Sequence, residues 1–168
     1  MRVLKIIEGT SVDGPGLRTS VYLAGCRHHC PGCHNPQSWD PQGGTEMSVD
    51  ELMQVIDYNE APVTLSGGDP LQHPGVLELA RRVREGGYNL WCYTGHTWEE
   101  ITSDPHLLEV VQLCDVVVEG RFVLAQRDTS LRFRGSKNQR IIDVRPTLAT
   151  GDITLFDGQN NEIGTRFA

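Results

Sequence analysis

Residues 61–93 read APVTLSGGDPLQHPGVLELARRVREGGYNLWCY, and this stretch decides the fold. Residues 61–66 predict a short buried strand that stops at the turn Gly67-Gly68-Asp69-Pro70. A helix is expected next, because apolar residues recur at helical spacing before Gly86-Gly87 closes the pattern. Residues 89–93 predict a second strand. A strand, a helix and another strand in this order are typical of a parallel sheet with helices packed against it.

The same alternation continues on both sides of this unit. Ser48 and Thr97 each begin a capping box, so we expect helices from residue 48 to about residue 59 and from residue 97 through Leu113. Further strands are expected at residues 19–23, 115–119 and 139–144. A complete eight-unit barrel takes about 250 residues. The sequence therefore predicts an α/β fold in which about five or six βα units form an open, partial barrel.

Length and charge limit the classes of function. The chain has 168 residues, of which 22 are acidic and 15 basic, and its formal net charge is −7. We expect a single domain over residues 1–168, with residues 147–168, which include Asp157-Gly158-Gln-Asn-Asn161, as a polar C-terminal extension that suggests a hairpin. No apolar run approaches the roughly 18 residues of a membrane span and the N-terminus lacks a signal peptide pattern, so we expect a cytoplasmic protein that binds no membrane. The acidic balance argues against nucleic acid as a partner.

Three of the five cysteines, Cys26, Cys30 and Cys33, stand in a loop that follows the strand at residues 19–23. Clustered cysteines without a secretory signal indicate metal or redox chemistry before disulfides. Zinc usually takes four protein ligands, and His28, His29 or His34 could supply the fourth. An iron-sulfur cluster tolerates three thiolates, which leaves one iron without a protein ligand. The ligand count favours the cluster and leaves zinc open.

The turn at Gly67, Gly68 and Asp69 is the second feature that indicates chemistry. Two glycines let a ligand approach the backbone closely, and Asp69 adds a carboxylate beside it. Alone, this pattern is equally typical of a tight turn that leads into a helix. Loops that follow parallel strands meet at one end of the sheet, so the cysteine loop and this turn should lie together. The pair predicts a cationic ligand beside a cluster.

Four segments carry a resemblance to a known family. They are VDGPGLR at residues 12–18, GCRHHCPGCHN at residues 25–35 with Trp39, SGGDPL at residues 66–71 and RGSKNQR at residues 134–140. Together they resemble the radical S-adenosylmethionine (radical SAM) superfamily and, within it, the enzymes that activate glycyl-radical proteins. The last segment favours the activators of anaerobic (class III) ribonucleoside-triphosphate reductase. One departure is Gly32, which stands where many members carry an aromatic residue that stacks on adenine.

The resemblance implies a radical SAM oxidoreductase with a partial βα barrel. Cys26, Cys30 and Cys33 would hold a 4Fe-4S cluster, and S-adenosylmethionine would chelate the fourth iron. Reductive cleavage would give methionine and a 5′-deoxyadenosyl radical, which would take a hydrogen atom from a glycine Cα of the partner reductase. The family suggests flavodoxin as the electron donor.

The resemblance also implies roles for single residues. Gly67 and Gly68 would offer backbone carbonyls to the ammonium group of the cofactor, and Asp69 would add a negative charge or orient the turn. The backbone at Gly32 and His34 should pass beside the adenine. Tyr93, Thr94 and Gly95 are candidate contacts for the ribose or the adenine, and core packing explains Tyr93 equally well.

The remaining notable side chains have simpler interpretations. Cys92 and Cys114 are expected to be buried small hydrophobes, and His28 and His29 to face solvent in the cysteine loop. The three tryptophans are expected to pack in the protein. A basic stretch is either a solvated loop or a contact with the cofactor carboxylate or the partner; it comprises Arg132, Arg134, Lys137 and Arg140.

Two other functions remain open from the sequence. A chain of this length could be a radical SAM enzyme that acts on a small molecule, as in modified-nucleoside biosynthesis. It could also be a zinc-binding module without catalysis, in which case purified protein would hold about one zinc instead of about four irons.

Overall fold

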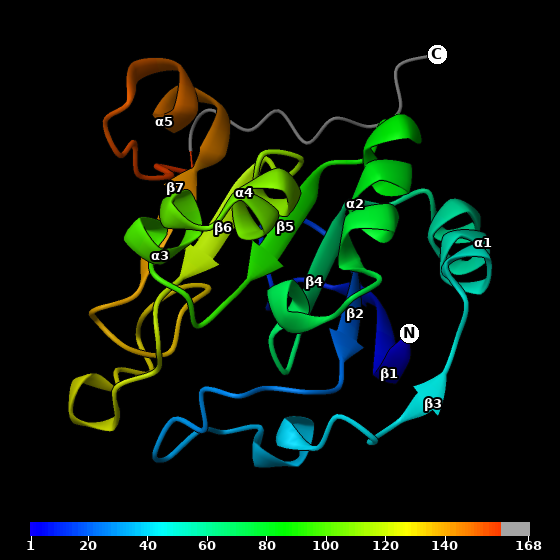
Figure 1. The fold of residues 1–168 in the computed structure, drawn as a ribbon, viewed down its shortest axis with the longest axis horizontal. Coiled ribbons are helices and arrows are strands. Elements are labelled where there is room, and N and C mark those ends of the chain that lie inside the picture. Colours follow the sequence, from blue (N-terminus) through cyan, green and yellow to red (C-terminus); the bar gives the residue numbers. More distant parts are fainter. Residues whose placement is uncertain (159–168) are drawn as a thin grey trace.

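A computed structural model describes residues 1–158, which form a mixed α/β fold around one open sheet (Figure 1). The seven strands lie in the order β3-β1-β2-β4-β5-β6-β7. Their bounds are β1 (Arg2–Thr10), β2 (Arg18–Leu23), β3 (Thr45–Glu46), β4 (Val63–Gly67), β5 (Leu90–Tyr93), β6 (Val116–Glu119) and β7 (Arg140–Asp143).

The two predicted capping boxes each begin a helix as expected, and residues 1–158 contain five α-helices. They are α1 (Val49–Asn59), α2 (Val76–Glu85), α3 (Trp98–Ser103), α4 (Pro105–Val111) and α5 (Val144–Thr150), with short 3-10 turns η1 (Pro36–Trp39), η2 (Pro70–Gln72) and η3 (Leu124–Gln126). The capping boxes of Ser48 and Thr97 are both formed. The single helix expected over residues 97–113 was wrong, because Asp104 ends α3 and caps α4. Pro105 has no N–H to continue the first helix, and it disfavours a helical conformation at the residue before it.

The sheet is mixed, not wholly parallel as expected. Strands β2, β4, β5 and β6 are parallel neighbours, and β1, β3 and β7 pair antiparallel at the two sides. Three crossovers through helices join the parallel strands, fewer than the five or six units expected. Residues 120–139 contain only the short turn η3, so β7 returns antiparallel beside β6. The sequence analysis missed β1, the longest strand of the sheet.

The two faces of the sheet carry different residues, because successive side chains of a strand point to opposite sides. One face forms the main core with the helices; its members include Val21, Leu65, Cys92, Val117, Leu52, Ile56, Leu79 and Ile101. The opposite face has a smaller cluster around Trp91, Val116 and Val118. The predicted burial of Cys92 and Cys114 is confirmed.

Arg18 is buried on the face that carries Trp91. Its Nε donates to Thr64 Oγ1 at 2.7 Å, its Nη2 donates to Val63 O at 2.7 Å, and its guanidinium lies 5.2 Å from the Trp91 ring centroid. Burial lowers the pKa of Arg18 to about 10. A Cβ on Gly14 would lie 2.8 Å from Arg18 Cδ, so glycine at position 14, in the segment VDGPGLR, leaves the space that this side chain fills.

The segment after β7 covers part of the same face. Leu155 forms a bridge with Ile142, and Phe156 N donates to Ile141 O at 2.9 Å. The Phe156 ring centroid lies 5.0 Å from that of Trp91. The hairpin suggested for the C-terminal extension is not found in its described part, because residues 147–150 continue helix α5 and residues 151–158 form no strand. Residues 159–168 lie outside the described part of the chain.

No helix in the described part of the chain combines the length and the apolar character needed to cross a bilayer.

We predict that Arg18→Ala lowers the free energy of unfolding by about 3 kcal/mol, because it removes a buried cation and leaves its acceptors without their donors. Urea denaturation of the apoprotein measures this loss. Arg27→Ala is the matched control: Arg27 is exposed, and its truncation should change stability by less than about 0.5 kcal/mol. Equal losses for the two variants would contradict this account of Arg18.

Candidate functional site

The cysteine loop and the glycine turn lie together at one edge of the sheet, as predicted. Strands β2 and β4 are parallel and end side by side, with Leu23 paired to Gly67. Two backbone hydrogen bonds join the segments there: Gly68 N donates to Leu23 O at 2.7 Å, and Asp69 N donates to Gly25 O at 2.9 Å. A third, from Gly25 N to Ser38 O at 2.8 Å, lies within the cysteine loop. In Figure 1 the cysteine loop runs along the lower edge of the molecule, below these strand ends.

The three cysteines of the loop are free thiols, each partly exposed. The N–H of Cys33 donates to Cys30 O at 3.0 Å, which closes a tight turn, and the N–H of Asn35 lies 3.4 Å from Cys33 Sγ. Burial raises the pKa of the Cys26 thiol, and backbone N–H groups of His28 and His29 oppose that rise by donating to its sulfur. Amide donors aimed at sulfur stabilise thiolates. The donor set fits an iron-sulfur cluster held by three protein ligands.

Asp69 is a buried junction between chain segments. Its carboxylate accepts hydrogen bonds from Leu71 N at 3.0 Å, Thr94 Oγ1 at 2.9 Å and Gly95 N at 3.0 Å. His28 Nε2 lies 2.7 Å from Asp69 Oδ2. The acceptor sites of this carboxylate are therefore taken by donors of the chain itself. Of the two roles expected for Asp69, this geometry favours orientation of the turn.

His28 does not face solvent, so that prediction was wrong. Its side chain is 7% exposed, and its ring lies between Asp69 and His96. His29 is exposed as expected, and its ring lies 4.9 Å from that of Trp39. The difference arises because consecutive loop residues point in different directions, and the partner of His28 lies 41 positions away.

The two glycines of the turn have no room for side chains. A Cβ on Gly67 would lie 2.3 Å from Leu23 O, and one on Gly68 would lie 2.2 Å from Gly25 O. Gly67 also has a φ of +103°, which side-chain-bearing residues rarely adopt. The carbonyl of Gly67 accepts from Asn35 Nδ2 at 3.2 Å, a second tie between turn and loop that the sequence analysis missed.

The loop before β7 approaches the cysteine loop at Gly32. A Cβ on Gly32 would lie 2.8 Å from Leu124 Cδ1, so Leu124 uses the space that a side chain at position 32 would need. His34 is exposed, with its ring 6.5 Å from Phe122. Leu124 is a large apolar residue with 54% of its surface exposed. Its place beside the third cysteine was not foreseen from the sequence.

Tyr93 and Thr94 lie at the end of β5 and differ in their contacts. Thr94 is buried and donates to Asp69, so it takes part in the junction. The Tyr93 hydroxyl is buried without a hydrogen-bond partner among residues 1–158, and burial raises its pKa. Its ring packs with the cluster around Trp91. Both interpretations of Tyr93, packing and cofactor contact, remain compatible with this position.

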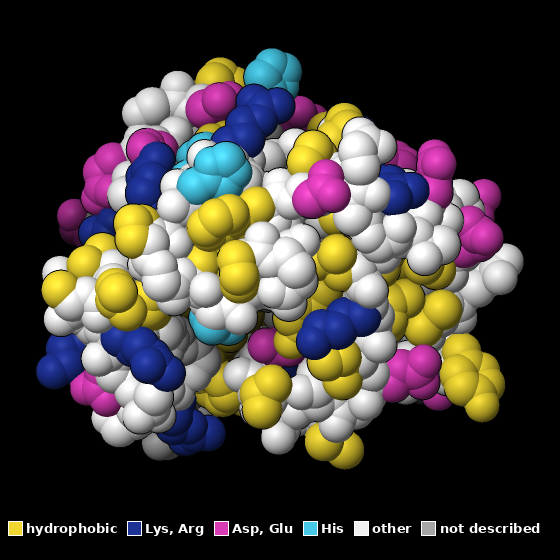
Figure 2. Space-filling model, turned by 90° about the horizontal axis from the view of Figure 1, so that it is seen from below, with side chains coloured by type: hydrophobic (Ala, Val, Ile, Leu, Met, Phe, Trp, Pro, Cys, Tyr) yellow, Lys and Arg dark blue, Asp and Glu magenta, His cyan; other side chains and the backbone are white. Residues whose placement is uncertain are grey.

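A cavity of about 680 Å³ opens beside the cysteine loop. Cys26, Arg27, His29 and Trp39 line one side, and residues 72–75 line another. Of the residues expected to hold the cluster or the cofactor, Cys26 alone lines it. Figure 2 views the molecule from this end, where hydrophobic side chains spread over the middle of the face.

The basic stretch makes contacts within the chain. Arg140 Nε donates to the buried Glu119 carboxylate at 2.5 Å, Arg134 Nη1 donates to Gln139 O at 2.6 Å, and Lys137 Nζ lies 3.5 Å from Asp128. These bonds fold residues 120–140 into a compact loop. Arg132 and Lys137 are exposed, as a solvated loop would have them, whereas Arg134 and Arg140 have partners within the chain; a contact with the cofactor carboxylate or the partner stays a prediction.

Comparison with known proteins identifies the family. A family model described as a 4Fe-4S single cluster domain matches residues 12–142. Anaerobic ribonucleoside-triphosphate reductase-activating protein of Escherichia coli (strain K12) is 37% identical over 145 residues, which cover 80% of this chain and 93% of that protein. The chain belongs to this family of activating proteins.

Other members of the activating-protein family match over similar lengths. The protein from Vibrio cholerae is 34% identical over 77% of this chain and 90% of its own, and the one from Enterobacteria phage T4 is 30% identical over 77% and 86%. The family model and the cysteines support an iron-sulfur cluster. The match to the family model ends at residue 142, so helix α5 and the segment that reaches Phe156 lie beyond it.

We predict that Gly68→Ala lowers the free energy of unfolding by about 2 kcal/mol, because the new methyl group collides with the backbone of Gly25. Gly75→Ala is the control, since a Cβ there meets only the flexible Met1 side chain, at 3.0 Å, and should cost less than about 1 kcal/mol. Urea denaturation compares the two. A smaller loss for Gly68→Ala than for Gly75→Ala would show that loop and turn are not closely packed.

Proposed function

We propose that this chain activates anaerobic ribonucleoside-triphosphate reductase by generating a glycyl radical on it. One observation carries the proposal: a loop with three free thiols and a glycine turn lie next to each other at one edge of the sheet, and hydrogen bonds join them. The names of the relatives supply the partner reductase.

Cys26, Cys30 and Cys33 would hold a 4Fe-4S cluster, and the fourth iron would bind S-adenosylmethionine. When bound, this pair would supply one-electron reductive cleavage of the S–C5′ bond, with methionine released, and hydrogen-atom abstraction from the glycine Cα of the reductase. The protein holds the reacting groups in place and excludes side reactions. Backbone N–H groups that donate to the sulfurs of Cys26 and Cys33 stabilise the thiolate ligands.

The turn after β4 would receive the ammonium group of the cofactor. The carbonyls of Gly67 and Gly68 are the proposed acceptors, since an ammonium only donates. Asp69 holds the turn by accepting a hydrogen bond from Leu71 N, and Thr94 orients the Asp69 carboxylate by donating to it. We further propose that the backbone at Gly32 and His34 passes beside the adenine, and that Tyr93 faces the ribose or the adenine.

The open sheet supports a large partner as the substrate. We propose that the fold is a partial barrel of the radical SAM type, formed by residues 1–168 as a single domain, and that the side of the sheet opposite the main core admits a segment of the reductase. Phe133 and Phe156 pack on Trp91 there, and they would limit how deep that segment reaches. Flavodoxin as electron donor and a cytoplasmic location belong to the same proposal.

Iron analysis with cysteine variants tests the cluster. Protein reconstituted without oxygen should hold about four irons per chain, and Cys26→Ser, Cys30→Ser or Cys33→Ser should each lose most of that iron and its visible absorbance. Cys114→Ala is the control, because Cys114 is buried in the core away from the loop, and it should keep the full iron content. About one zinc per chain in place of iron would refute the cluster.

Activity with the partner tests the reaction. Reduced, reconstituted protein should cleave S-adenosylmethionine to methionine and 5′-deoxyadenosine, and addition of the reductase should produce a glycyl radical signal in electron paramagnetic resonance (EPR). Replacement of the target glycine of the reductase by alanine should abolish that signal without affecting cleavage. Cleavage with no radical on the reductase would point instead to a small-molecule substrate.

A further inference from the structure

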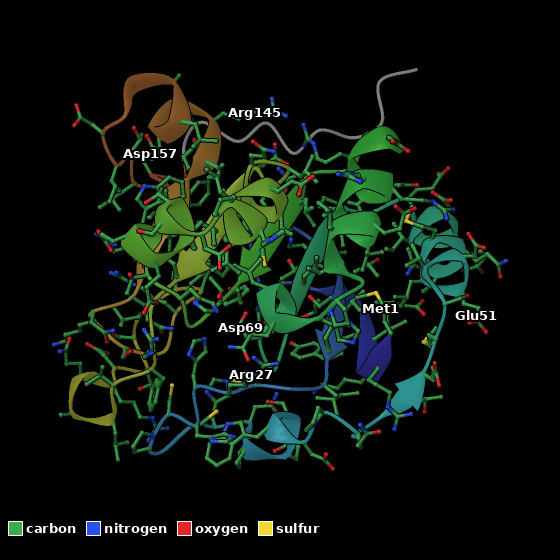
Figure 3. The ribbon with its side chains drawn as sticks, viewed as in Figure 1. Met1, Arg27, Glu51, Asp69, Arg145 and Asp157 are labelled. Atoms are coloured by element: carbon green, nitrogen blue, oxygen red, sulfur yellow. The ribbon has the colours of Figure 1, made fainter. Side chains whose placement is uncertain are left out.

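His28 joins the cysteine loop to the glycine turn through its side chain. The ring stands between Cys26 and Cys30 in the chain, and its Nε2 lies 2.7 Å from Asp69 Oδ2. The side chains of His28 and Asp69 are 7% and 1% exposed. Asp69 Oδ2 already accepts from Gly95 N, so we assign His28 Nε2 as a second donor to this oxygen. In Figure 3 Asp69 lies next to the part of the loop that bears Arg27.

The surroundings of the His28 ring are shaped to hold it. A Cβ on Gly95 would lie 2.4 Å from His28 Cδ2, so the ring occupies space that only glycine leaves free. The His96 ring packs edge-on against it, with 4.7 Å between centroids. Gly95 N donates to the same oxygen of Asp69 at 3.0 Å. A loop residue that merely faced solvent would not need this enclosure.

The Asp69 carboxylate thereby connects three segments. It holds its own turn through Leu71 N, the end of β5 through Thr94 and Gly95, and the cysteine loop through His28. Among the side chains between Cys26 and Cys30, His28 alone forms a hydrogen bond to this carboxylate within the described residues 1–158. Its removal would loosen the stretch that carries two of the thiols, which would keep the hydrogen bond from Arg27 N to Gln72 Oε1 at 2.8 Å.

We propose that His28 is a positioning residue that sets the distance between the cluster ligands and the turn that receives the cofactor ammonium. The inference rests on the proposed function. Reacting groups must be held to within about 0.5 Å, and side chains that orient ligands typically change affinity or activity by about 10–100-fold when removed. His28 meets the structural requirement because it is buried, hydrogen-bonded and two residues from each of Cys26 and Cys30.

A metal ion is the competing interpretation of this cluster. One ligand atom each from His28, Asp69 and His96 lie within 4.8 Å of one another. A cation there would have to replace the donors that already fill the Asp69 carboxylate. We therefore interpret the cluster as a hydrogen-bonded junction. His96→Ala should then leave the metal content of the protein unchanged, and loss of a non-iron metal in that variant would overturn the interpretation.

The test uses variants that distinguish loss of the hydrogen bond from His28 to Asp69 from a general change in the cysteine loop. In reconstituted protein, His28→Ala should keep at least half of the iron but raise the Kd for S-adenosylmethionine by about tenfold or more, measured from the change that the cofactor causes in the EPR spectrum of the reduced cluster. His28→Gln, whose Nε2 can still donate to Asp69, should stay within about threefold of the wild-type Kd. Gly95→Ala displaces the ring from the other side and should reproduce the effect of His28→Ala.

His29→Asn is the matched control. It alters only the exposed side chain of the neighbouring loop residue and keeps the backbone N–H that donates to the Cys26 sulfur, and asparagine tolerates the φ of +46° at this position. The variant should bind the cofactor as the wild type does. A wild-type Kd in His28→Ala, or equal loss of iron in His28→Ala and His28→Gln, would overturn the proposal.

Failure of the proposed function would look different. Wild-type protein would then hold no four-iron cluster or would not cleave S-adenosylmethionine. The junction itself can be tested without any cofactor, because hydrogen exchange of the loop amides in the apoprotein should become about tenfold faster in His28→Ala and not in His29→Asn. Unchanged exchange in His28→Ala would contradict the inference whatever the cofactor.

Discussion

The attachment of the cysteine loop to the turn after β4 is the constraint on which the site depends. Parallel pairing of β2 and β4 brings the two segments to the same edge of the sheet. Backbone hydrogen bonds from Gly68 and Asp69 then hold the loop against the turn, and glycine at positions 67 and 68 permits this close approach. A buried carboxylate completes the attachment, because Asp69 receives donors from the loop, the turn and β5.

The sequence predicted the parts of the site that are local. Three cysteines at short spacing, a Gly-Gly-Asp turn after a strand and two capping boxes each depend on neighbours a few positions away, and each is found where expected. The break between α3 and α4 was visible in Asp104-Pro105 and was overlooked. The strand β1 was missed because its polar and apolar residues alternate irregularly, and its place is set by pairing with β2.

Contacts between distant segments could not be predicted in the same way. His28 was expected in solvent because the loop is polar, yet its ring is enclosed by Asp69, Gly95 and His96. Leu124 occupies the space beside Gly32, and no sequence pattern near the cysteines predicts this contact. The antiparallel return of β7 likewise follows from a loop that folds on itself through Arg134, Gln139 and Glu119.

The central claim is that three thiols hold an iron-sulfur cluster with one iron left for the cofactor. Electron–nuclear double resonance on the reduced cluster, with S-adenosylmethionine labelled by ¹⁵N at its amino group, tests it most directly. The account predicts a nitrogen coupling strong enough to indicate a bond from that amino group to iron. A nitrogen coupling that is the same with labelled and with unlabelled cofactor would come from the protein, as from a histidine ligand, and would contradict the claim.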